Sequence, residues 1–235
     1  MSQPSNGSGF DAYATGYDAA LGRGLSVSGE AKAYFARGRV DWLRTCLRQQ
    51  YEQPQQVLDF GCGTGTASPF LLQVLGAKTL VGIDVSAESL AIAQATHGSA
   101  RVQFVHLDQY KPNNNIDLVF SNGVFHHIPP SERPNAMRLV YHSLRPGGLF
   151  ALWENNPWNP GTRLVMRRIP FDRDAITLSP PTARRLAEEG GFEVLGISFL
   201  FIFPRLLNGF RRFETSLTRW PLGAQYQVLA RKPRQ

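Results

Sequence analysis

A group of glycines flanked by acidic residues is the part of this 235-residue chain whose spacing most clearly predicts chemistry. Gly61, Gly63 and Gly65 directly follow the apolar stretch Gln56–Phe60, and Asp59 stands two residues before the first glycine. Glycines allow a chain to turn sharply from a strand into a helix and to pass close beneath a ligand. The pattern therefore predicts a site for a nucleotide-like molecule at the end of a strand.

The spacing of the glycines separates two classes of ligand. A dinucleotide site uses G-x-G-x-x-G, which places a pyrophosphate at the N-terminus of a helix. The sixth position is Thr66 counted from Gly61 and Ser68 counted from Gly63, so neither register fits. The carboxylate of Asp59 would repel a phosphate but suits a cationic ligand with an amino group. S-Adenosylmethionine (SAM), with its sulfonium and ammonium groups, meets that description.

Two further acids follow later apolar stretches. Asp84 stands nineteen residues after Gly65 and ends the stretch Leu80–Ile83. A carboxylate at this place can accept hydrogen bonds from both hydroxyls of a ribose. Asp108 ends a third stretch and can accept a hydrogen bond from an adenine amino group. The three acids together predict a site for a whole nucleoside with a cationic substituent.

These residues require a fold that brings the ends of several strands to one edge. Apolar stretches alternate with segments of helical periodicity, which predicts a doubly wound α/β fold with a seven-stranded, mostly parallel sheet whose last strand is antiparallel. The predicted strands are Gln56–Phe60, Thr79–Asp84, Val102–Leu107, Ile116–Ser121, Leu149–Trp153, Glu193–Phe203 and Ala224–Arg231. The predicted helical segments are Phe10–Leu21, Ser28–Gln50, Gly65–Leu75, Ser86–Ala95, Ser131–Leu144, Thr182–Glu189 and Arg205–Arg219.

We expect one domain over residues 1–235, because neither a repeat nor a linker interrupts the chain. Residues 10–50 are expected to form a helical cap over its open end. Residues 154–181 and 204–222 are expected to form insertions beside the substrate.

Five segments, taken in order, resemble the class I SAM-dependent methyltransferases. They are VLDFGCGTG, VGIDVS, VQFVHLD, IDLVFSNGVFHHI and LRPGGLFALWE, and they cover about residues 55–155. The resemblance implies a Rossmann-like methyltransferase fold, SAM as the cofactor, and the site residues that these segments contain. At the methionine end and the ribose it implies Asp59, Gly61, Cys62, Gly63 and Asp84. Around the adenine and beneath the ligand it implies Val85, Leu107, Asp108, Gln109, Asn122 and Gly123.

Three residues are candidates for acid–base chemistry. Methyl transfer needs the nucleophile held close to the methyl group, and it needs a base only when the acceptor arrives protonated. His126 and His127 follow the predicted fourth strand, and Glu154 ends the fifth, so all three would face the open end of the sheet. The alternative for each is a structural role. No metal site is expected, because Cys46 and Cys62 lack partners at ligand spacing.

The acceptor is expected to bind in the parts outside the five segments. These parts combine aromatic residues with arginines, which suits an apolar or ring-bearing acceptor with an anionic group. The aromatic candidates are Tyr13, Tyr17, Tyr34, Trp158, Phe171, Phe210, Phe213 and Trp220. We also expect Tyr17, or an arginine among residues 37–39, to close over the SAM carboxylate. The alternative is that the aromatic residues only pack the cap and the last strands.

The favoured function is methyl transfer to an O, N or C atom of a small, possibly lipid-linked, metabolite. A net charge of +7 raises nucleic acid as an alternative acceptor. The sequence disfavours two such enzymes: Ser121-Asn122-Gly123-Val124 replaces the Asn/Asp-Pro-Pro-aromatic motif of adenine amino methylation, and neither cysteine follows proline. A SAM-binding partner protein without catalysis is the third reading.

Location is predicted from composition. No apolar run approaches the roughly 18 residues that span a membrane, and two cysteines do not suggest a disulfide framework, so we expect a cytoplasmic protein. The basic stretch 206–219 leaves peripheral contact with a membrane open. The oligomeric state is not predicted.

Overall fold

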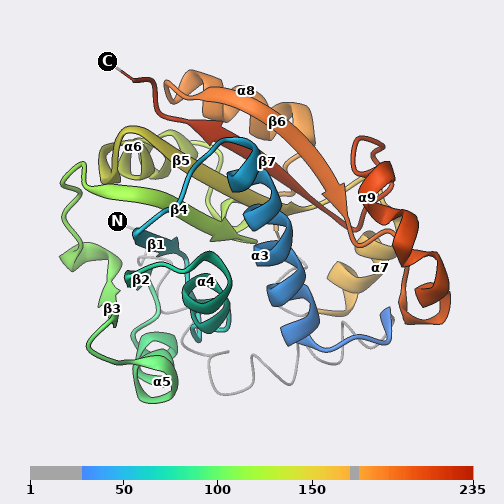
Figure 1. Ribbon diagram of the computed structural model, residues 1–235, viewed down its shortest axis with the longest axis horizontal. Coiled ribbons are helices and arrows are strands. Elements are labelled where there is room, and N and C mark those ends of the chain that lie inside the picture. The colour runs from blue at the N-terminus through green and yellow to red at the C-terminus, as the bar shows by residue number, and fades with distance from the viewer. Residues whose placement is uncertain (1–27, 170–174, 235) are drawn as a thin grey trace, which may run out of the picture.

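A seven-stranded sheet forms the centre of the part of the chain described by the computed structural model, residues 28–169 and 175–234 (Figure 1). Its order is β3-β2-β1-β4-β5-β7-β6. The first five strands run parallel, and β7 is antiparallel to both β5 and β6, which confirms the predicted fold class. The strands are β1 (Gln56–Phe60), β2 (Thr79–Asp84), β3 (Val102–His106), β4 (Ile116–Asn122), β5 (Leu144–Asn155), β6 (Glu193–Leu200) and β7 (Gln225–Arg231).

Helices cover both faces of this sheet (Figure 1). On one face, α3 (Lys32–Gln49) and α4 (Ser68–Leu75) pack against a cluster of buried apolar side chains that includes Val57 and Trp153. On the other, α6 (Arg133–Ser143) and α8 (Pro180–Glu189) pack against a second cluster that includes Leu58. Neighbouring residues of a strand point to opposite faces, so Val57 belongs to the first cluster and Leu58 to the second.

The carboxyl ends of the parallel strands meet at one edge, as predicted. β2 ends at Asp84, and β4 ends at Asn122. A short 3₁₀ segment follows β3 (η2, Leu107–Gln109) and another follows β4 (η3, Phe125–His127). The helix α5 (Ala87–His97) begins just after β2, capped by the Ser86 side chain as the sequence indicated.

Several predicted boundaries were wrong: α3 begins at Lys32 rather than at Ser28, and β5 begins at Leu144 rather than at Leu149. The helix α4 begins at Ser68 rather than at Gly65, because Gly65 adopts a positive φ of 75°. The helix α6 begins at Arg133 rather than at Ser131, with no side-chain cap. The strand β6 ends at Leu200 rather than at residue 203, because Phe201 adopts a φ of 62°, which breaks the extended chain.

The connection predicted at residues 154–181 contains a helix that sequence reasoning missed. This helix, α7 (Pro160–Arg168), is capped by the Asn159 side chain, which accepts a hydrogen bond from the Thr162 N–H at 3.0 Å. The basic stretch forms the 3₁₀ segment η5 (Arg205–Phe213) and a short α9 (Glu214–Leu217). The predicted helix Phe10–Leu21 lies outside the described residues, as do Tyr13, Tyr17 and Phe171. A search of the described helices for one long and apolar enough to cross a bilayer finds none.

Candidate functional site

The glycine-rich turn joins β1 to α4 and lies against β2. The N–H groups of Gly61 and Cys62 both donate to the Ile83 carbonyl, at 2.8 and 3.0 Å. Gly61 and Gly63 adopt positive φ values of 71° and 52°, which residues with a side chain rarely do. A methyl group on Gly61 would lie 2.3 Å from a methyl of Val124, whereas nothing lies within 4 Å of one on Gly63.

Replacing each of the two glycines by alanine is therefore expected to lower the free energy of unfolding by a different amount. Gly61→Ala is expected to lower the free energy of unfolding by about 2–4 kcal/mol, because left-handed strain and overpacking add. Gly63→Ala carries only the strain, about 1–2 kcal/mol, and its new methyl projects into open space. Urea unfolding measures both, and a Gly63→Ala protein as unstable as Gly61→Ala would contradict this assignment.

Asp84 is held in place by this turn. One carboxylate oxygen accepts the Gly63 N–H at 2.7 Å, and the other accepts the Ser86 N–H at 3.0 Å. Burial raises the pKa of Asp84, and these backbone N–H groups oppose that rise. The half-buried carboxylate is thus fixed at the end of β2 with one edge toward a cavity.

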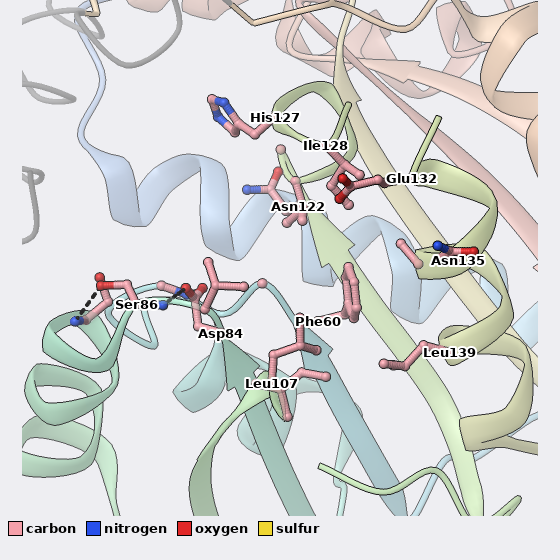
Figure 2. Close-up of a pocket in the computed structure, with 18 of the residues that line it drawn as sticks. Phe60, Asp84, Ser86, Leu107, Asn122, His127, Ile128, Glu132, Asn135 and Leu139 are labelled. Atoms are coloured by element: carbon pink, nitrogen blue, oxygen red, sulfur yellow. Dashed lines mark hydrogen bonds between the residues drawn. The ribbon is translucent and has the colours of Figure 1, made fainter. Parts of the chain in front are cut away.

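A cavity of about 370 Å³ lies above the ends of β1, β2 and β4. Figure 2 shows Asp84 and Ser86 on one side of it, Asn122 and His127 above, and on the opposite side Asn135 on α6 and Glu132, which directly precedes that helix. We call this the first cavity. Of the predicted cofactor residues, it brings together Gly61, Gly63, Asp84, Val85, Leu107, Asn122 and Gly123. Sequence reasoning missed six further lining residues, which flank η3 or belong to or directly precede α6: Val124, Ile128, Pro129, Glu132, Asn135 and Leu139. The first two lie within the segment IDLVFSNGVFHHI, and the other four carry no distinguishing motif.

The remaining four predicted cofactor residues do not line this cavity. The Asp108 side chain is 88% exposed, with one oxygen 3.6 Å from the His106 ring, and Gln109 beside it is also exposed. The thiol of Cys62 lies against its neighbour's carbonyl, with its Sγ 3.6 Å from the Gly63 oxygen. Burial, with the nearby charges of Asp59 and Asp84, raises the pKa of this thiol, so it stays protonated.

Asp59 is buried beneath the turn, on the sheet face that α3 covers. No described residue donates a hydrogen bond to its Oδ2 atom. Burial raises the pKa of Asp59 to about 7, the charge of Asp84 adds to the rise, and Arg39 opposes it. A buried carboxylate without a donor on one oxygen suits a neighbouring cationic group, which is the property that the sequence indicated.

This raised pKa gives a test in the absence of ligand. Between about pH 4 and 7 the folded protein keeps a proton on Asp59 that the unfolded chain has lost, so stability falls as pH rises. Asp59→Asn is expected to remove that decline and to be more stable than the native chain at pH 8 by roughly 2–4 kcal/mol. Urea unfolding across this range measures it. Parallel profiles for the two proteins would exclude a raised pKa.

The three predicted catalytic residues lie together, and two of them, His126 and Glu154, form a buried pair. The Nδ1 atom of His126 lies 2.5 Å from one oxygen of Glu154, and the other oxygen accepts the Phe125 N–H at 2.8 Å. Both side chains of the pair are almost fully buried. Glu154 therefore holds the His126 ring through its Nδ1 side. His127 is half-buried beside it, with the two ring centres 4.0 Å apart.

The loop that carries the two histidines is fixed by Arg133. Its Nε donates to the carbonyls of Phe125 and Ile128, each at 3.0 Å, and one terminal nitrogen donates to the carbonyl of Ile176. The N–H of Ile176 in turn donates to the His126 carbonyl at 3.0 Å. These hydrogen bonds fix the backbone of the loop that carries the two histidines.

A second cavity, of about 380 Å³, lies between α3, α7 and η5. Among the described residues, its charged lining consists of Lys32, Arg39 and Arg211 with one acid, Glu30, which pairs with Arg211 at 2.9 Å. The guanidinium of Arg211 also lies over the Tyr34 ring, 4.7 Å from its centre. Both His126 and His127 line this cavity, with Glu154 behind them.

The two cavities adjoin. Asn122, Gly123 and His127 line both of them, and the Oδ1 atom of Asn122 has no partner within the described chain. Of the five described aromatic candidates for the acceptor site, Tyr34 alone lines the second cavity, and the other four are exposed at the surface. Sequence reasoning missed Asn155, Asn159 and Gln225, polar residues that line it from the ends of β5 and β7 and from the start of α7.

Comparison with known proteins identifies the family of the residues that form this site. Residues 57–148 match the family model described as "Methyltransferase domain". These residues form a class I SAM-dependent methyltransferase domain. This match confirms the family that the five segments resemble, and it implies SAM as the cofactor.

Individual relatives are similar to about half of this chain. Trans-aconitate 2-methyltransferase of Rhodopseudomonas palustris (strain BisB18) is 28% identical over 51% of this chain and 46% of its own length. Cyclopropane-fatty-acyl-phospholipid synthase of Escherichia coli (strain K12) is 29% identical over 46% of this chain and 28% of its own. The chain therefore spans about half, or less, of these relatives.

A solved structure shows that the fold extends beyond the matched segment. A chain of the complex between the Haloferax volcanii Trm112 methyltransferase activator and a putative methyltransferase superposes with a TM-score of 0.65. The superposition covers 98% of this chain and 99% of that one, at 18% identity. At that identity the likeness concerns the fold alone.

Proposed function

We propose that this protein transfers the methyl group of SAM to a nucleophilic atom of a small anionic molecule. The observation that carries the proposal is the pair of adjoining cavities, one walled by the predicted cofactor residues and the other by basic side chains. A cavity of about 380 Å³ is of the size that takes a metabolite. Because both cavities are lined by Asn122, Gly123 and His127, reactants bound in the two cavities would lie side by side.

The residues of the first cavity suit SAM. Asp84 presents a fixed carboxylate for the ribose hydroxyls, and the open space at Gly63 admits a ligand against the backbone. The donor-free oxygen of Asn122 in this cavity, and that of Asp59 beneath the turn and outside the cavity lining, are polar groups that a cationic amino acid end would satisfy. When bound, SAM supplies an electrophilic methyl group.

The residues of the second cavity suit a carboxylate or phosphate on the acceptor. Three basic residues line it against one acid, and Arg guanidinium groups bind such anions through paired hydrogen bonds. That trans-aconitate 2-methyltransferase is among the relatives supports an acidic metabolite. Which atom is methylated, O, N or C, depends on the acceptor.

We assign His126 as the general base for an acceptor that arrives protonated. Glu154 would hold the proton of Nδ1 and thereby leave Nε2 as the basic atom on the ring. In this role Glu154 positions the histidine and stabilises its charged form, because the pair is buried. His127, which lines both cavities, would contact the reactants without that partner.

The experiment is a screen for release of S-adenosylhomocysteine from SAM with a panel of mono-, di- and tricarboxylates and phosphorylated metabolites. Uncharged analogues of each acid, such as its amide, serve as matched controls. We expect turnover with at least one acid and a loss of about 100-fold in kcat/KM for its uncharged analogue. Turnover with tRNA or DNA and with none of the metabolites would favour the nucleic-acid alternative raised by the charge of +7. SAM binding with no turnover at all would favour a non-catalytic role.

A further inference from the structure

The aromatic and leucine residues of the basic segment project outward beside the second cavity. Six large apolar side chains are exposed on this part of the surface: Leu206, Leu207, Phe210, Phe213, Trp220 and Leu222. Leu206 is 92% exposed and Trp220 is 62% exposed. Figure 1 shows η5 and α9 at one end of the molecule, beside α7 and on the side opposite to β3 and α5.

The charges on the same segment are of one sign. The exposed charged residues between positions 204 and 222, all of which the structure describes, are Arg205, Arg212 and Arg219. The single acid there, Glu214, is half-buried and accepts the Ile202 N–H at 2.9 Å, so it faces inward. The Arg212 guanidinium lies over the Phe213 ring, 4.8 Å from its centre. We call these nine side chains, the six apolar ones and the three arginines, the arginine–aromatic face.

Such a surface has a recognisable partner. Apolar and aromatic side chains at this density are unusual on a protein surface facing only water. Leu and Phe insert into the boundary between lipid headgroups and acyl chains, Trp prefers that boundary, and arginines attract anionic headgroups. An acidic protein surface would explain the arginines, but it would not by itself favour leucines exposed to this degree.

We propose that the arginine–aromatic face docks on an anionic lipid bilayer. The charge complementarity of three exposed arginines without an exposed acid carries the choice of partner. The face adjoins the second cavity, since Phe203, Pro204 and Arg211, which line that cavity, belong to or precede η5. A docked bilayer would therefore lie beside the cavity. The inference goes beyond the proposed function, because binding to vesicles requires no acceptor and no turnover.

Co-sedimentation of the full chain with lipid vesicles tests the proposal. Vesicles of phosphatidylcholine alone are compared with vesicles that also contain phosphatidylglycerol, at low and at high salt. We expect binding to the anionic vesicles at low salt, at least tenfold weaker binding at high salt, and little binding to phosphatidylcholine. Equal binding to both kinds of vesicle, or none to either, would overturn the proposal. Absence of binding is the result expected if residues 1–27 or a protein partner covers the face instead.

Variants locate the binding surface. Arg212→Gln with Arg219→Gln is expected to weaken vesicle binding about 30-fold, and Phe210→Ala with Trp220→Ala to weaken it at least tenfold with the charges intact. Arg184→Gln with Arg185→Gln removes the same charge from exposed positions on α8 and is expected to change binding less than twofold. All three double variants should keep the native unfolding temperature and affinity for S-adenosylhomocysteine. If the α8 variant loses vesicle binding to the same extent, binding depends on net charge alone, and a specific binding face is rejected.

Discussion

Replacing His126 by asparagine is expected to lower kcat by about 10²- to 10⁴-fold, the usual contribution of a general base. The asparagine Nδ2 group can take the place of the ring Nδ1–H and donate to Glu154, so the buried carboxylate keeps a partner. No basic atom then remains where Nε2 stood. Affinity for SAM should stay within about twofold, because His126 does not line the first cavity.

Glu154→Gln is the variant that separates a catalytic pair from a structural one. Its amide oxygen can still accept the Phe125 N–H, but its NH₂ group must donate to Nδ1 of His126. The histidine then carries its proton on Nε2 and cannot act as a base there, so kcat should fall by about 10³- to 10⁴-fold. Native kcat in a protein with either substitution would show that the pair serves structure only.

The second large effect is expected on binding of the cofactor. Asp84→Asn should weaken the affinity for SAM by at least 100-fold, since two hydrogen bonds to a charged group, at about 1.5–3 kcal/mol each, lose their charged acceptor and one of its two oxygens becomes a donor. The amide also cannot accept both backbone N–H groups that the carboxylate now accepts, from Gly63 and Ser86. Isothermal titration with SAM and with S-adenosylhomocysteine measures the loss.

Asp108→Asn provides the comparison for Asp84. Its side chain is 88% exposed, so any hydrogen bond to the adenine competes with water, and the expected loss of affinity is less than about tenfold. Thermal unfolding without ligand shows whether either variant has lost stability as well as affinity. If Asp108→Asn weakens binding as much as Asp84→Asn, the adenine end of the site must be more enclosed than the free protein indicates.

The walls of the first cavity, the proposed donor site, could be predicted in part because local sequence determines them. Gly61 and Gly63 adopt the backbone angles that other residues avoid, and Asp84 ends a strand that its alternating apolar residues already mark. Each of these signals lies within a few residues of the feature that it predicts. The sheet order followed because right-handed crossovers leave few arrangements for such a chain.

The acceptor side could not be predicted to the same degree, because its walls depend on packing between distant segments. Arg39 on α3 donates to Gln225 on β7 at 2.8 Å, a contact over 186 positions that no local pattern announces. The exposed position of Phe210 and Phe213 also depends on how η5 leaves the sheet after Phe201, whose positive φ is unexpected for a phenylalanine. The helix α7 was missed although Asn159-Pro160 is a typical start signal.

The two cavities differ in how the chain assembles them. Every described residue that lines the first cavity falls between positions 60 and 139, whereas the described lining of the second includes residues 28–39 and 155–225 from both flanks. The described wall of the first thus comes from one continuous stretch, and that of the second combines segments far apart in the chain. If the first cavity binds SAM and the second the acceptor, as proposed, exchange of the flanks between relatives is expected to change the acceptor and leave the methyl donor site intact. In hydrogen exchange we expect the flanks to open at lower free energy than the central strands, so that acceptor recognition is lost before the fold is.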